Sequence, residues 1–183
     1  AAHWYRKAAD QGYSRAQSNL GFCYERGIGV QQDYAQAAAL YRQAADQGDA
    51  AGQFNLGYLY AVGHGVEQNW AKAAHWYQTS AKQGYSWAQC NLGWCYEQGR
   101  GVAKNLEQAA RWYRLAAEQG DDTSQHNLGY LYERGLGVAR DWTEAVKWYQ
   151  ASADQGYADA QFRLGRCYEL GTGVPQDLDR ALE

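Results

Sequence analysis

The sequence repeats itself every 36 residues, and this period limits what the chain can fold into. A period of roughly 20 to 50 residues is typical of repeat architectures, in which each unit buries its apolar face only by stacking on its neighbours. The sequence therefore predicts one solenoid domain over residues 1–183. The complete copies are 13–48, 49–84, 85–120 and 121–156, with partial copies at 1–12 and 157–183.

The first helix of each repeat is predicted by its apolar spacing and by the glycine that follows it. In the first complete copy this helix spans about residues 15–26, with Leu20 and Cys23 on its apolar face. Gly27 then ends the helix, since glycine adopts the left-handed conformation of a helix stop at little cost.

A glycine loop and a second helix complete the repeat. The loop reads Gly-x-Gly-Val in every copy, and three residues later comes an aspartate or asparagine that can cap the next helix. The second helix of the first copy buries Ala37, Tyr41 and Ala45 and ends at Gly48. The expected N-caps are Asp33, Asn69, Asn105, Asp141 and Asp177.

A further glycine recurs inside the first helix, where glycine costs about 1 kcal/mol relative to alanine. A cost repeated at one position implies a gain repeated there. We expect the gain to be the close approach of a neighbouring helix, with a tyrosine or tryptophan facing the glycine. The glycines concerned are Gly21, Gly57, Gly93, Gly129 and Gly165.

The charge of the chain argues against two classes of partner. Its net charge is -3, whereas a general nucleic-acid or anionic-membrane surface needs a cationic excess. No apolar run reaches the roughly 20 residues that a membrane-spanning helix needs. The first residue is not Met, which suggests a piece of a longer protein, and we expect apolar surface at its two ends to support end-to-end self-association.

The repeat resembles the Sel-1-like repeat family, a tetratricopeptide-like group common in bacteria. The resemblance implies an all-α fold, a right-handed α/α superhelical solenoid of 36-residue helix-loop-helix repeats. It also implies a scaffold or adaptor that binds another protein, with no shared catalytic residues and no cofactor. In the third copy the pattern is met by Ala88, Leu92, Gly93, Tyr96, Gly99, Gly101, Val102, Ala109, Trp112, Tyr113, Ala116, Ala117 and Gly120.

A partner protein or extended peptide is expected on the concave face, which the first helices usually line in solenoids. Positions spaced i, i+4, i+7 and i+11 share one side of a helix, and here they combine aromatic, asparagine and arginine side chains. We call these positions the first-helix face. The asparagines and aromatics are also explained by a structural role, as caps or bridges between helices. The candidate partner-binding residues are Arg15, Asn19, Phe22, Arg26, Asn55, Tyr58, Trp87, Asn91, Trp94, Asn127, Tyr130 and Arg134, and the fifth copy adds Arg163 and Arg166.

No catalytic or metal site is predicted. Cys23, Cys95 and Cys167 alternate with leucine at a core position, so we interpret them as small buried hydrophobes. Unpaired thiols fit a reducing, cytoplasmic compartment. The histidines do not cluster, and His126 alone lies where it could touch a ligand.

Two rival functions stay open at this point. A helical-repeat RNA-binding protein has a similar period but needs a cationic groove. A cysteine-rich relative of the family would be an enzyme or a binder of β-lactams and cell-wall ligands, but it carries paired cysteines within each repeat.

Overall fold

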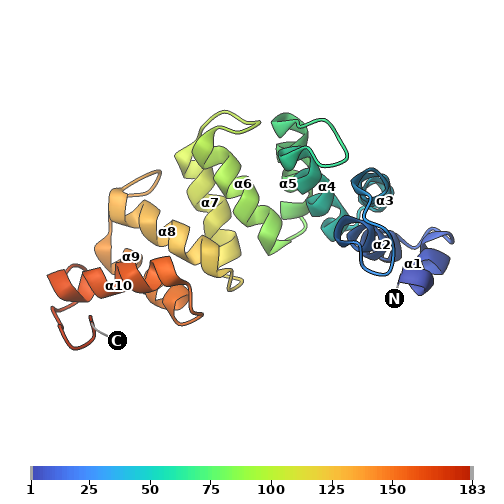
Figure 1. Ribbon diagram of the computed structural model, residues 1–183. Coiled ribbons are helices and arrows are strands. Elements are labelled where there is room, and N and C mark those ends of the chain that lie inside the picture. Colours follow the sequence, from blue (N-terminus) through green and yellow to red (C-terminus); the bar gives the residue numbers. More distant parts are fainter. Residues whose placement is uncertain (1, 182–183) are drawn as a thin grey trace. The chain divides into compact units, whose positions relative to one another are not determined.

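A computed structural model describes residues 2–181, and within this part every regular element is a helix. Figure 1 shows the helices joined by loops in chain order. The prediction of an all-α chain of helix-loop-helix repeats is confirmed. The helices are α1 (Ala2–Ala9), α2 (Ser14–Arg26), α3 (Tyr34–Asp46), α4 (Ala50–Val62), α5 (Trp70–Ala81), α6 (Ser86–Gln98), α7 (Leu106–Ala117), α8 (Asp122–Arg134), α9 (Trp142–Ala153) and α10 (Ala158–Leu170).

The contacts divide the chain into two compact units. The first unit holds Ala1–Ala88 with Arg100–Ala103, and the second holds Gln89–Gly99 with Lys104–Glu183. In the first unit α2 packs on α3 and α4 packs on α5, while in the second α8 packs on α9. That the repeats act as one domain over residues 1–183 stays a prediction.

Each glycine loop follows a first helix and packs against the preceding repeat. Gly63 and Gly65 have φ values of 80° and 69°, in the left-handed region that glycine tolerates. A Cβ atom on Gly65 would collide with the backbone carbonyl of Tyr34, the first residue of the preceding second helix. The second glycine of the loop is therefore required twice, by its conformation and by this contact between repeats.

The predicted N-caps are confirmed. The side-chain oxygens of Asp33, Asn69, Asn105 and Asp141 each accept a backbone N–H from the first turn of the second helix, at 2.9–3.0 Å. Asp177 accepts the N–H of Arg180 at 3.1 Å, although only a turn follows it within the described residues.

The glycine inside the first helix faces a tyrosine ring in each of the four complete repeats, as predicted, whereas Gly165 of the fifth copy meets no tyrosine within the described residues. A Cβ atom on Gly93 would lie 2.8 Å from Cδ1 and 2.9 Å from Cε1 of Tyr113. The same contact recurs between Gly21 and Tyr41 and between Gly129 and Tyr149. These tyrosines are among the largest fully buried side chains, so the missing side chain of glycine makes room for the core of each repeat.

The hydroxyl groups of three of these tyrosines donate to glutamates inside the repeat. The hydroxyls of Tyr41, Tyr113 and Tyr149 donate to Glu25, Glu97 and Glu133, each at 2.7 Å. Burial, together with the adjacent carboxylate, raises the pKa of each tyrosine. The second repeat differs, because alanine occupies the glutamate position at residue 61.

Glutamines form a further set of bonds that ties the repeats together. The Nε2 of Gln53 donates to the Ala45 carbonyl of the preceding repeat at 3.2 Å. Its Oε1 accepts from the Nε2 of Gln83, in the turn that follows the second helix α5 of its own repeat, at 2.7 Å. The Gln53–Gln83 pair thus links α4 to the preceding helix α3 and to the end of α5. The other pairs are Gln17 with Gln47, Gln89 with Gln119 and Gln125 with Gln155.

Two kinds of joint alternate between successive repeats. Where the next repeat opens with tyrosine, an aromatic ring of the first helix packs on it: Phe54 on Tyr85 at 5.4 Å, and His126 on Tyr157 at 5.2 Å between ring centroids. Where the next repeat opens with aspartate, the same first-helix position holds a small residue. Cys90, for example, lies near Asp121, whose carboxylate accepts the Ser124 N–H at 2.7 Å. Large first-helix residues thus meet tyrosine openings and small ones meet aspartate openings, in alternate repeats.

Candidate functional site

The aromatic positions of the first-helix face reach solvent. Phe22, Tyr58, Trp87 and Trp94 expose 44, 41, 59 and 38% of their surface, and Tyr130 is half-buried. The apolar positions on the opposite side of the same helices are buried, Leu20, Leu56 and Leu92 among them. The first helices of the first three complete repeats therefore each present a solvent-exposed aromatic side chain, while the opposite side of the helix is buried.

Arginines lie over two of these aromatic rings. The guanidinium carbon of Arg26 is 5.7 Å from the ring centroid of Phe22, and that of Arg134 is 5.7 Å from Tyr130. Arg163 approaches the Tyr130 ring from the following repeat, at 5.2 Å. The structure thus brings Tyr130, Arg134 and Arg163 together, which the spacing within one helix does not predict.

The asparagines of the face differ in what surrounds them. Asn19 is exposed, while Asn55, Asn91 and Asn127 are half-buried. Within residues 2–181 the side chains of Asn19 and Asn55 make no hydrogen bond, whereas Asn127 Oδ1 lies 3.3 Å from Nδ1 of His126. The amides of Asn19 and Asn55 are open to an incoming ligand.

Trp87 belongs to an aromatic group that the sequence analysis did not assemble. Between ring centroids, Trp87 lies 6.1 Å from Phe54 and 5.7 Å from Tyr85, and Phe54 lies 5.8 Å from Tyr77. Phe54 lies one position before Asn55, outside the helical spacing used to choose the face. The sequence alternates between large and small residues at this repeat position, and this alternation is the signal that could have identified Phe54.

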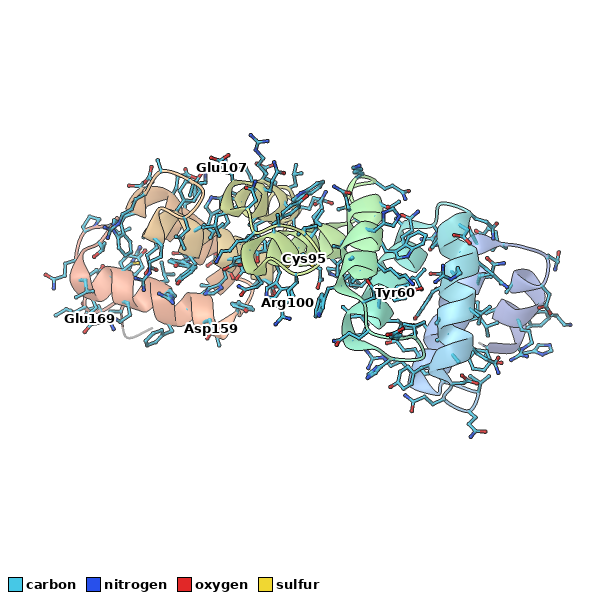
Figure 2. The ribbon with its side chains drawn as sticks, turned by 90° about the horizontal axis from the view of Figure 1, so that it is seen from above. Tyr60, Cys95, Arg100, Glu107, Asp159 and Glu169 are labelled. Carbon is cyan, nitrogen blue, oxygen red and sulfur yellow. The ribbon has the colours of Figure 1, made fainter. Side chains whose placement is uncertain are left out.

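The remaining candidate residues have structural surroundings. The ring of His126 packs on Tyr149 and Tyr157, and burial lowers its pKa. Cys23, Cys95 and Cys167 are buried, as expected of a core position. Burial raises the pKa of the Cys95 thiol to about 12. All four cysteines are free thiols, and Figure 2 shows Cys95 inside α6.

In the described part of the chain, no group of three or more histidine, cysteine, aspartate or glutamate side chains is arranged to hold a metal ion. No helix of residues 2–181 has the length and apolar character needed to cross a membrane.

The repeat, its glycine loop and its solenoid packing define a Sel1 repeat protein. The Sel1 repeat family model matches residues 1–13, 14–49, 50–85, 88–121, 123–157 and 158–183, so the chain belongs to this family. Sel1 repeat proteins are generally protein-interaction scaffolds. The family and its solved members are typically non-enzymatic.

Two solved structures resemble the chain over nearly its whole length. A protective antigen present in uropathogenic Escherichia coli strains, with an SLR fold, is 42% identical with a TM-score of 0.94. The match covers 98% of this chain and 38% of the antigen. A Sel1 repeat protein from Oxalobacter formigenes is 39% identical with a TM-score of 0.88, over 94% of this chain and 68% of that protein.

A mammalian relative matches over a single repeat. The DAP3-binding cell death enhancer 1 of Rattus norvegicus is 49% identical over 37 residues. That match spans 20% of this chain and 7% of the rat protein, so the chain corresponds to a small part of that relative.

Proposed function

We propose that the chain is a scaffold that binds a partner protein, or an extended peptide of one, on the first-helix face of its repeats. The observation that carries this proposal is the exposed aromatic side chain at the same repeat position, Phe22 and Tyr58 in the first unit and Trp94 in the second. Aromatic residues and arginine are the side chains that dominate binding energy in protein interfaces.

The asparagines support an extended partner. A side-chain amide both donates and accepts, so Asn19 and Asn55 can pair with the backbone of a peptide whatever its sequence. The aromatic side chains beside them supply apolar contacts for alternate side chains of that peptide. Such a surface selects a partner by its backbone and by a few apolar residues.

Affinity capture from native lysate tests the proposal. The intact chain is compared with Tyr58→Ala/Trp94→Ala, and with Leu115→Ala as a control whose leucine is 45% exposed on the second helix α7. A partner held by the intact chain and by the control, but lost by the folded double variant, supports the first-helix face. A partner that all three retain places binding elsewhere.

The rival functions have direct tests of their own. Ultraviolet absorbance of the purified protein detects bound nucleic acid, which an RNA-binding repeat protein would retain. A labelled penicillin detects β-lactam binding. Either signal at stoichiometric level would replace the scaffold as the primary function.

Self-association is a further proposal about partners. Trp4 and Leu178, in the repeats nearest the two ends, are 69 and 60% exposed. Light scattering at rising protein concentration checks for end-to-end pairing, and a strictly monomeric species would argue against it.

A further inference from the structure

A small cavity opens between the last residues of α8, the start of α9 and one side of α10. Its volume is about 270 Å³, and three arginines, Arg134, Arg163 and Arg166, line it together with the single glutamate Glu133. Trp142 and Leu170 add apolar walls. We call this the arginine cavity. Its lining is cationic, although the whole chain carries a net charge of -3.

The carboxylate of Glu133 is already enclosed by donors. It accepts the Tyr149 hydroxyl at 2.7 Å and Nη1 of Arg163 at 3.1 Å, and Nε of Arg134 lies 3.4 Å away. The Glu133 side chain is only 11% exposed, whereas those of Arg134 and Arg166 are each 56% exposed. Nε of Arg166 lies 3.4 Å from Oε2 of Glu169, which is 55% exposed and does not line the cavity. Among the lining residues, the charges that meet solvent are therefore mostly positive.

Arg163 has hydrogen-bonding capacity left over. Both of its contacts to Glu133 use the same nitrogen, Nη1, and a guanidinium group carries five N–H donors in one plane. Within residues 2–181 nothing accepts from its Nε or Nη2. Two donors on one guanidinium are the arrangement that binds a carboxylate in a bidentate way.

Arg163 is not needed to hold the buried glutamate. In the first repeat Glu25 is also buried and accepts the Tyr41 hydroxyl at 2.7 Å, yet the following repeat supplies Asn55 at the position of Arg163. The other repeats likewise have an aromatic residue where the fifth has Arg166. The fifth repeat therefore adds two cations that the fold does not demand.

We propose that the arginine cavity binds an acidic side chain of the partner, with a neighbouring apolar residue packing on Trp142 and Leu170. This inference rests on the proposed scaffold function and names the chemistry of one contact in it. A volume of about 270 Å³ suits one side chain rather than a whole peptide. The pairing of exposed guanidinium groups with a carboxylate supplies both attraction and orientation.

A matched pair of peptides tests the proposal on the full chain. The probe is acetyl-Gly-Glu-Leu-Glu-Gly-amide, whose only charges are on its side chains. The control peptide carries Gln in place of both Glu residues. Isothermal titration is expected to give binding of the acidic peptide that weakens with salt, and at least roughly tenfold weaker binding of the Gln peptide. Equal binding of the two peptides, or no binding of the acidic one, would overturn the proposal.

Variants locate the site. Arg134→Gln/Arg166→Gln should lose binding of the acidic peptide at least roughly tenfold, since it removes two charge-assisted contacts. Lys147→Gln is the control, because Lys147 is a 63% exposed cation on α9, outside the first-helix face, that lies over Trp148 and 3.2 Å from Glu144. Far-ultraviolet circular dichroism checks that both variants are folded. Unchanged binding by the folded double variant would refute the assignment.

The same variants separate this inference from the scaffold proposal. If Tyr58→Ala/Trp94→Ala loses the captured partner but the acidic peptide does not bind, the arginine cavity is wrong and the scaffold face stands. If the acidic peptide binds at the arginines but the captured partner is retained by Tyr58→Ala/Trp94→Ala, the arginine cavity stands and the aromatic positions Tyr58 and Trp94 are not the binding site.

Discussion

Replacing Gly93 with alanine tests how closely the first helix of a repeat packs on the tyrosine of the second. The added Cβ atom would lie 2.8 and 2.9 Å from two ring carbons of Tyr113, whereas carbon atoms attract best at about 3.5–4.0 Å. Tyr113 is 0% exposed, so its ring has no free space to move into. The substitution therefore forces a shift inside the core.

Two opposing effects set the magnitude. Alanine gains about 1 kcal/mol over glycine inside a helix, while overpacking a core costs about 1–3 kcal/mol. Gly93→Ala should therefore destabilise the chain by about 0–2 kcal/mol. Gly165 supplies the control in the fifth repeat, because within residues 2–181 a Cβ atom there meets only the Ala181 carbonyl, at 3.4 Å. Gly165→Ala should stabilise by up to about 1 kcal/mol.

Urea denaturation followed by circular dichroism measures both free energies of unfolding. Compared with the unsubstituted chain, the urea midpoint of unfolding should be lower for Gly93→Ala and higher for Gly165→Ala. If Gly93→Ala stabilises the chain as much as Gly165→Ala does, the tyrosine contact does not explain why glycine recurs inside the first helix.

Three further predictions follow from titratable groups. The pKa of Tyr113 is raised in the folded chain, so the free energy of unfolding should fall as the pH rises above 10.0. Urea midpoints should show a smaller fall for Tyr113→Phe. The pKa of His126 is lowered, so stability present above about pH 6.5 should fall on acidification, and a flat midpoint between pH 7 and 5 would contradict this. The pKa of the Cys95 thiol is about 12, so iodoacetamide should label it only after denaturation, as mass spectrometry would show.

The parts of the fold that depend on local chemistry could be predicted from the sequence. Helix caps such as Asn69 and the left-handed loop glycines follow from residue type and position within a few residues. A tyrosine or tryptophan opposite Gly93 could be predicted, because a glycine that destabilises its helix must be compensated by a close contact. Each of these features can be read from residue type and repeat position within one repeat.

Contacts between repeats could not be predicted in the same way. The partner of Gln53 is Gln83, 30 residues later, and glutamine is on average a surface residue, so nothing local marks it as buried. The approach of Arg163 to Tyr130 depends on the register between two first helices, which the periodicity of one helix does not contain. That the first-helix face binds a partner stays a prediction, and its arginine cavity became visible only in three dimensions.

The alternation of two joints between repeats has a consequence for how such a gene can change its length. Losing one repeat from this chain would bring an aromatic residue such as Phe54 against an aspartate opening, or a small residue such as Cys90 against a tyrosine. Losing two adjacent repeats would restore a matching joint. Recombination among the similar copies should therefore preserve matching joints when the number of repeats changes by two, and should disrupt a joint when it changes by one.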